Sequence, residues 1–149
     1  MQGNNVLAVN AEVAIVDDDE SIREAIKTLL ESMRLRVEDF SSADTFLNSA
    51  RVENFDCLLL DVRMPGLNGL ELQRRLIADN SRVPIVFITA HFREEDRAKA
   101  MAAGAVAFLS KPFSESELLT AIRSAFASRK NASARYAEET DGAEEQRGM

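Results

Sequence analysis

The sequence predicts a doubly wound α/β fold, in which a five-stranded parallel sheet carries five helices on its two faces. Three observations lead to this fold class: short apolar runs, helix-like spacing of apolar residues between those runs, and short connections throughout. Right-handed crossovers favour the strand order 2-1-3-4-5, although the spacing of the runs does not by itself fix that order.

Five segments are predicted as strands. Four of them are continuous apolar runs that suit parallel strands buried on both faces, namely residues 13–16, 57–60, 85–88 and 106–109. The fifth segment, residues 35–40, is half polar, so we expect it at an edge of the sheet.

Helices are predicted between and after these strands. Apolar residues recur every three or four positions over 22–33 and over 118–126, which is typical of one buried helix face. Residues 70–78 and 94–103 show a weaker form of the same pattern. Gly104 follows the second of these segments at a position where helices commonly end.

Two capping boxes predict where further helices begin. Ser41 with Asp44 follows the second strand, and Ser114 with Glu117 follows the fifth. In each pair the serine side chain is expected to bind the backbone amide of the acidic residue three positions later.

The composition predicts one globular domain. With 149 residues, of which 46% are hydrophobic, the chain can bury a single core, which we place in residues 12–128. Residues 1–11 are expected to be flexible, and residues 129–149 to form a flexible tail or a fraying helix. The single cysteine, Cys57, excludes an internal disulfide and a cysteine-based zinc site.

Charge and hydropathy restrict the partners and the location. A formal charge of −7 argues against direct nucleic-acid binding, because phosphate contacts need clustered Lys and Arg. No apolar run is long enough to cross a bilayer, and the first residues lack a signal-peptide pattern. The sequence therefore predicts a cytoplasmic protein that contacts no membrane.

Polar residues follow four of the predicted strands. They are Asp17, Asp18, Asp19 and Glu20 after the first strand, Asp61 after the third, Thr89 after the fourth, and Lys111 after the fifth. In an open parallel sheet, ligands bind beyond the carboxyl ends of the strands, so we expect these side chains to share one edge.

The residue types at this edge favour a hard cation and phosphoryl chemistry. Neighbouring carboxylates repel one another unless a cation shares the site, and oxygen ligands suit Mg²⁺. Asp61 is a candidate nucleophile that would form an aspartyl phosphate. Lys111 and Thr89 would then bind phosphoryl oxygens, through a positive charge and a hydroxyl donor respectively.

Four segments, VDDDE, LLLDVRMPG, FITA and FLSKPF, resemble the phosphoacceptor receiver domain of two-component response regulators over residues 12–127. The sequences of these segments are similar to those of the nitrogen-fixation class of these regulators, and the resemblance implies a flavodoxin-like fold. It also implies that Asp61 is the phosphorylated residue. Mg²⁺ would be held by Asp17, Asp18, Asp61 and the backbone carbonyl of Arg63.

The same resemblance implies roles for the remaining residues of the edge. Thr89 corresponds to the switch hydroxyl, Lys111 to the phosphate-binding lysine, and Phe108 to the aromatic switch position on the last strand. Asp19 becomes a cap of the first helix. The Lys111–Pro112 peptide bond would be cis.

Taken together, these residues predict a single-domain response regulator that accepts a phosphoryl group from a sensor histidine kinase onto Asp61. We expect no enzymatic activity beyond its own phosphorylation and dephosphorylation. The phosphoryl group would switch the face formed by the fourth helix, the last strand and the last helix. That face would then bind a downstream protein or a second copy of the chain.

Two other kinds of protein compete with this interpretation. In the first alternative, the chain is the receiver part of a longer DNA-binding transcription regulator. In the second, it is a phosphatase or a phosphate-binding or flavin-binding α/β domain. An aspartate-based phosphatase would need a second aspartate two positions after Asp61, where Arg63 stands. Flavin binding would need a hydroxyl-rich loop after the first strand, where four acids stand.

Overall fold

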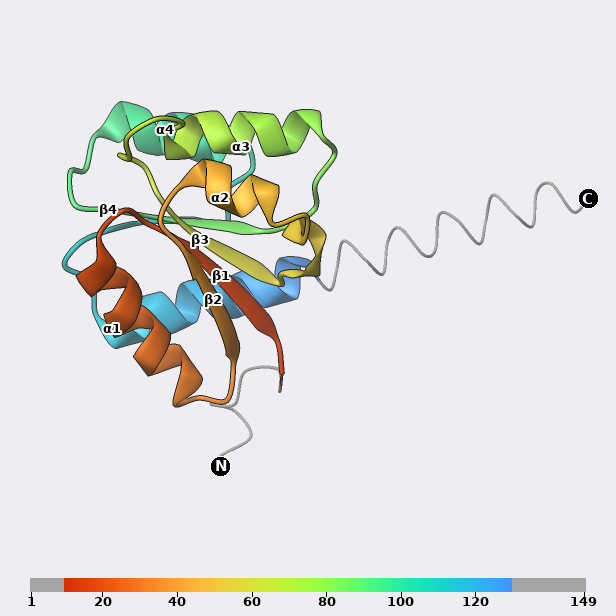
Figure 1. Ribbon diagram of the computed structural model, residues 1–149. Helices are drawn as coiled ribbons and strands as arrows, with labels where there is room; N and C mark the ends of the chain where they lie inside the picture. Colours follow the sequence, from red (N-terminus) through yellow and green to blue (C-terminus); the bar gives the residue numbers. More distant parts are fainter. Residues whose placement is uncertain (1–9, 130–149) are drawn as a thin grey trace, which may run out of the picture.

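The computed structural model describes residues 10–129, which form a parallel sheet covered by helices on both faces (Figure 1). The strand order is β2-β1-β3-β4-β5, so the predicted doubly wound, flavodoxin-like fold and its order are confirmed. The strands are β1 (Glu12–Val16), β2 (Arg36–Phe40), β3 (Cys57–Asp61), β4 (Ile85–Thr89) and β5 (Ala107–Ser110).

The helices divide between the two faces of the sheet. They are α1 (Glu20–Glu31), α2 (Ala43–Asn48), α3 (Gly69–Ala78), α4 (Glu94–Ala102) and a last helix over residues 115–129, with a short 3-10 turn, η2 (Val52–Asn54), before β3. Figure 1 shows α1 and the blue last helix on one face and α2, α3 and α4 on the other. Both faces of the central strands are therefore removed from water.

Burial follows this layering. Every residue of β3 and β4 is buried, as continuous apolar runs predict for central parallel strands. On the face covered by α2, Phe40 of β2 and Phe46 of α2 pack edge to face with ring centroids 5.3 Å apart. On the other face, Leu118 and Ile122 of the last helix are buried against β1, β3 and β4. Each face thus has its own apolar core.

The burial predicted for one strand is wrong. The run 106–109 was expected to be buried on both faces, but β5 lies at the edge of the sheet and is only half buried. The side chains of this run pack only partly against the apolar cores of the two faces. Among the described residues, β5 has a neighbouring strand, β4, on one side only. The predicted edge strand, β2, does lie at the other edge.

The helix starts were predicted with one error. Ser42, rather than Ser41, caps α2, and its Oγ accepts a hydrogen bond from the Thr45 amide at 3.1 Å. Two consecutive serines precede the helix, and the extended backbone at Ser42 gives it the cap position. The capping box of the last helix is confirmed, because Ser114 and Glu117 bind each other's backbone amides at 3.0 and 2.8 Å.

The described residues extend slightly beyond the predicted domain at both ends. Ala11 is buried, and its carbonyl accepts a hydrogen bond from the Arg36 amide at 2.9 Å. Arg129 belongs to the last helix and donates to the Glu53 carbonyl at 2.5 Å. The flexibility predicted for 1–9 and 130–149 concerns residues outside the described range. Between residues 10 and 129, no helix combines the length and apolarity needed to span a bilayer.

Candidate functional site

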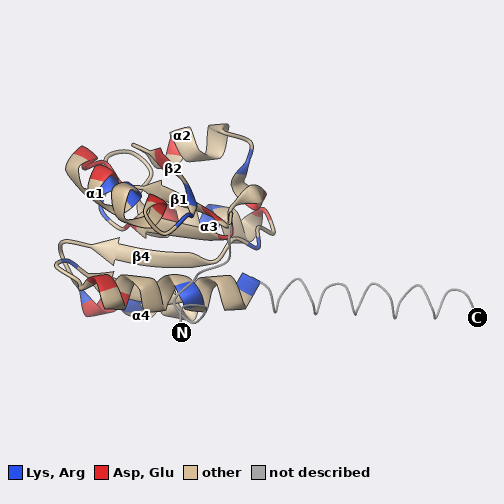
Figure 2. Ribbon diagram, turned by 90° about the horizontal axis from the view of Figure 1, so that it is seen from below, with Lys and Arg blue, Asp and Glu red and all other residues tan. Residues whose placement is uncertain are grey.

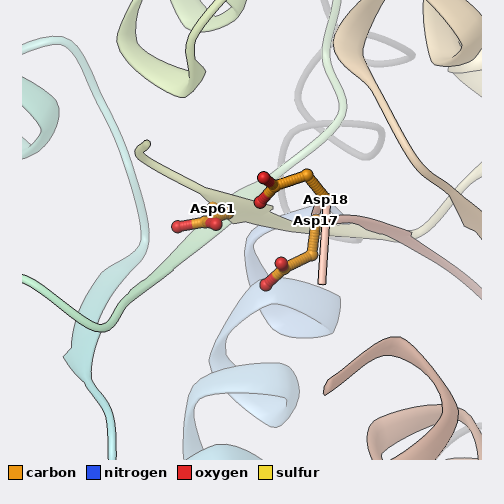
Figure 3. A group of neighbouring side chains, drawn as sticks. All are labelled: Asp17, Asp18 and Asp61. Carbon is orange, nitrogen blue, oxygen red and sulfur yellow. The ribbon is translucent and has the colours of Figure 1, made fainter. Parts of the chain in front are cut away.

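Three carboxylates meet at the carboxyl ends of β1 and β3. These strands pair in parallel with Val16 opposite Leu60, so the next residue of each chain segment, Asp17 and Asp61, lies beside the other. Oxygen atoms of Asp17, Asp18 and Asp61 lie within 4.8 Å of one another, and Figure 3 shows the three side chains around one space. The convergence predicted from the sequence is therefore present in the structure.

Asp17 is fully buried and is held by two donors. Its Oδ1 accepts from the Asp19 amide at 2.9 Å, and its Oδ2 accepts from Lys111 Nζ at 2.9 Å. A buried carboxylate is tolerated when it is paired and hydrogen-bonded, and both conditions hold here. The Asp19 side chain in turn caps α1, accepting from the Ser21 and Ile22 amides at 2.9 and 3.2 Å, as expected.

Asp61 is 6% exposed and has fewer partners than Asp17. Its Oδ1 accepts a hydrogen bond of 3.3 Å from the Arg63 amide. Burial, together with the negative charge of Asp17, raises the pKa of Asp61 to about 6, whereas the charge of Lys111 opposes this rise. Asp61 is thus a carboxylate whose charge is poorly compensated by the residues around it.

The donor set fits a hard cation. Within residues 10–129, the cluster of Asp17, Asp18 and Asp61 is the one group of three or more potential metal-ligating side chains whose ligand atoms come together in this way. Carboxylate oxygens suit Mg²⁺, and a cation there would offset the repulsion that raises the pKa of Asp61. Asp18 is exposed, so one side of the cluster is open to solvent.

Glycines position the loop that follows β3. The Gly69 amide donates to the Val62 carbonyl at 3.0 Å, which brings the start of α3 close to the backbone of β3. A Cβ atom at Gly69 would lie 2.2 Å from the carbonyl oxygen of Asp61. Gly66, with φ of +75°, adopts the left-handed conformation that glycine favours. The close approach of α3 to the backbone of Asp61 therefore requires glycine at position 69, and the backbone conformation at position 66 favours glycine.

Thr89 is the last residue of β4, and Lys111 directly follows β5. The Lys111 amide donates to the Thr89 carbonyl at 2.7 Å, and the Lys111–Pro112 peptide bond is cis, as the resemblance implies. Thr89 is fully buried, and its Oγ1 accepts from the His91 amide at 3.1 Å. In this structure the hydroxyl of Thr89 is therefore bound by its own loop, while the ammonium of Lys111 is bound by Asp17.

Phe108 lies on β5 opposite Phe87, with ring centroids 5.7 Å apart. Its other ring contact, 5.8 Å and edge to face, is Phe92, which is 47% exposed and lies in the loop between β4 and α4. In the structure, the exposed ring of Phe92 packs against the partly buried ring of Phe108.

One polar contact near the site was missed by the sequence analysis altogether. Nη2 of Arg63 lies 2.5 Å from Oδ2 of Asp96, in the first turn of α4. The two residues are 33 positions apart. Nothing in the spacing of charged residues along the chain indicates such a pair.

Comparison with known proteins gives consistent matches. Residues 13–123 match the family described as "Response regulator receiver domain". The response regulator protein TodT of Pseudomonas putida is 48% identical over 113 residues, which are 76% of this chain and 50% of TodT. The transcriptional regulatory protein FixJ of Bradyrhizobium diazoefficiens is 38% identical over 119 residues, which are 80% of this chain and 58% of FixJ.

Among solved structures, the response regulator StyR superposes with a TM-score of 0.79 at 47% identity, covering 93% of this chain and 69% of StyR. The predicted resemblance to the nitrogen-fixation class is confirmed by the match to FixJ. The chain spans about half the length of the curated relatives it matches. Because FixJ is named a transcriptional regulatory protein, the expectation that nucleic acid is not a partner conflicts with this relative.

Proposed function

The chain belongs to the response regulator receiver domain family, and from this premise we propose that Asp61 accepts a phosphoryl group from a sensor histidine kinase. The observation that carries the proposal is the cluster of Asp17, Asp18 and Asp61, with Lys111 bound to one of its members. An acceptor carboxylate, a set of cation ligands and a positive charge are the groups that phosphoryl transfer to aspartate needs.

In the proposed reaction, a carboxylate oxygen of Asp61 attacks the phosphorus atom of a phosphohistidine. The new oxygen–phosphorus bond forms as the nitrogen–phosphorus bond breaks, and the electron pair of that bond returns to the imidazole nitrogen. Attack of water on phosphorus later releases inorganic phosphate and restores the carboxylate. Although burial raises the pKa of Asp61 to about 6, this value is still below neutral pH, so the nucleophilic carboxylate form predominates there.

We infer that Mg²⁺ is held by the side chains of Asp17, Asp18 and Asp61 and by the Arg63 carbonyl. When bound, the cation neutralises charge on the phosphoryl oxygens. Lys111 would exchange its contact with Asp17 for one with a phosphoryl oxygen, and the Thr89 hydroxyl would turn from His91 to donate to another. Both residues already lie at the edge, so neither backbone has far to move.

The switch would follow from the movement of Thr89. Once its hydroxyl turns toward the phosphoryl group, space opens into which Phe108 rotates, and the face formed by α4, β5 and the last helix changes shape. The partly buried position of Phe108, in contact with the exposed ring of Phe92, supports this proposal. That face would then bind a downstream protein or a second copy of the chain.

The relatives favour a second proposal for the output. FixJ carries the name of a transcriptional regulatory protein, and this chain matches about half of it. A receiver of this kind would control a DNA-binding output, with the same chemistry at Asp61. In Figure 2, basic and acidic residues are mixed along the helices. Because phosphate contacts need clustered Lys and Arg, we expect the switched face itself to contact protein rather than DNA.

Intact mass after incubation with acetyl phosphate tests the proposal. A single phosphoryl adduct should form in the presence of Mg²⁺ and should be absent with EDTA. Asp61→Asn should form no adduct, whereas Asp79→Asn, a matched change at an exposed aspartate paired with Arg75, should react like the natural chain. An adduct that persists in the Asp61 variant would place the acceptor elsewhere.

A further inference from the structure

The ion pair between Arg63 and Asp96 joins the loop that follows β3 to α4. Asp96 is almost fully buried, with its side chain 8% exposed, whereas the side chain of Arg63 is 42% exposed. The guanidinium is thus paired with a carboxylate that has little access to solvent. The burial of Asp96 depends on this partner, because an unpaired buried carboxylate is costly.

α4 has few other attachments to the rest of the domain. Asp96 and Ala100 are its only buried residues, so no large apolar side chain anchors the helix in the core. At its other end, the buried side chain of Gln73 on α3 donates to the Ala100 carbonyl at 3.0 Å. One polar contact near each end therefore holds α4 against α3 and the loop after β3.

The backbone of Arg63 is tied to Asp61. The same residue that binds Asp96 through its side chain donates its amide to the carboxylate of Asp61 at 3.3 Å. A phosphoryl group on Asp61 would replace one carboxylate charge by nearly two, carried on oxygens that suit a guanidinium. Arg63 would then lie between two competing anions, one on Asp61 and one on α4.

We propose that the Arg63–Asp96 pair is a latch that holds the first turn of α4 while Asp61 is unmodified, and that modification of Asp61 releases it. Once Arg63 turns to the phosphoryl oxygens, Asp96 is left without its cation, and the first turn of α4 moves so that water reaches the carboxylate. Gln73 keeps its contact with Ala100, so the helix pivots about its carboxyl-terminal end. The release step rests on the proposed phosphorylation of Asp61, whereas the restraint on α4 does not.

Amide hydrogen exchange in the unmodified protein tests the restraint. The Arg97 amide donates to the Arg93 carbonyl and reports the first turn, and the Ala103 amide donates to the Lys99 carbonyl and reports the last turn. Asp96→Asn should speed exchange at Arg97 by about tenfold and leave Ala103 unchanged. The control Glu94→Gln removes one carboxylate from the same turn, where it forms an exposed pair, and should change Arg97 less than about twofold.

Arg63→Gln should reproduce the effect of Asp96→Asn, and Arg63→Lys should restore slow exchange, because lysine keeps the charge. In the double variant of Arg63→Gln and Asp96→Asn, exchange at Arg97 should be no faster than in either single variant. Equal exchange rates in Asp96→Asn and Glu94→Gln would overturn the latch.

Beryllofluoride with Mg²⁺, a phosphoryl mimic, tests the release. In the natural chain, exchange at Arg97 should rise to the rate seen in unmodified Asp96→Asn, and in that variant the mimic should cause no further rise. Fluorine NMR shows whether beryllofluoride is bound. If exchange at Arg97 stays slow while it is bound, the release is overturned. If beryllofluoride does not bind, both the release and the proposed function are overturned. The restraint on α4 is still tested by the exchange rates of the unmodified variants.

Discussion

Replacing Gly69 by alanine should damage the site in a way that helix propensity alone would not predict. Gly69 begins α3, where alanine is intrinsically better than glycine by about 0.5–1 kcal/mol. The added Cβ, however, would lie 2.2 Å from the carbonyl oxygen of Asp61, about 1 Å closer than ordinary contact allows. The atoms in collision belong to the backbone, so no side chain can turn aside to make room.

The expected cost follows from these two opposing contributions. Overpacking costs about 1–3 kcal/mol, and a collision with backbone belongs at the upper end of that range. After the gain in helix propensity, Gly69→Ala should lower the free energy of unfolding by about 2 kcal/mol. For a domain of this size, the melting temperature should fall by about 8 °C.

Urea denaturation measures this change, with Gly66→Ala as the matched control. At Gly66 a Cβ atom meets nothing within 4 Å, but the φ of +75° imposes a conformational cost of about 1 kcal/mol. Gly69→Ala should therefore be the more destabilised variant. If it proved as stable as the natural chain, the close approach of α3 to the backbone of Asp61 would be refuted.

Three further predictions concern Asp61, Asp18 and Phe108. Because the folded protein holds the pKa of Asp61 above its usual value, at about 6, the carboxylate destabilises the fold above that pH without Mg²⁺. Asp61→Asn should thus raise the free energy of unfolding at neutral pH by about 1–2 kcal/mol, a gain that fades between pH 6 and 4, and Asp79→Asn should show no such trend in the same urea titrations. Thermal denaturation should show stabilisation by Mg²⁺ in the natural chain and a weaker effect in Asp18→Asn, and an equal effect would exclude Asp18 as a ligand. NMR of the Phe108 ring should report a new rotamer when beryllofluoride is bound, so that an unchanged rotamer would contradict the coupling to Thr89.

Much of the fold could be predicted because the relevant signals are local. Continuous apolar runs mark β1, β3 and β4, since parallel central strands are buried on both faces. Local signals were insufficient where neighbouring residues were equivalent, as with the two serines before α2. Asn68 and Glu71 form a capping box at the start of α3 that follows the same sequence rule but was not among the predicted ones.

The convergence of the site was predictable for a different reason. Parallel strands end at the same edge, so the residues at the carboxyl ends of β1 and β3 must meet there whatever their side chains do. The partners of individual side chains were not predictable, because they depend on rotamers and on elements far apart in sequence. Lys111 binds Asp17 from 94 residues away, and Arg63 reaches Asp96 on α4.

Trapping the phosphorylated residue with borohydride tests the central claim most directly. Borohydride reduces an aspartyl phosphate to homoserine, so peptide mapping by mass spectrometry identifies the acceptor after treatment with acetyl phosphate. The account predicts one homoserine, at position 61, formed only when Mg²⁺ is present during phosphorylation. Homoserine at another aspartate, or a phosphoryl adduct with no reducible residue at position 61, would contradict it.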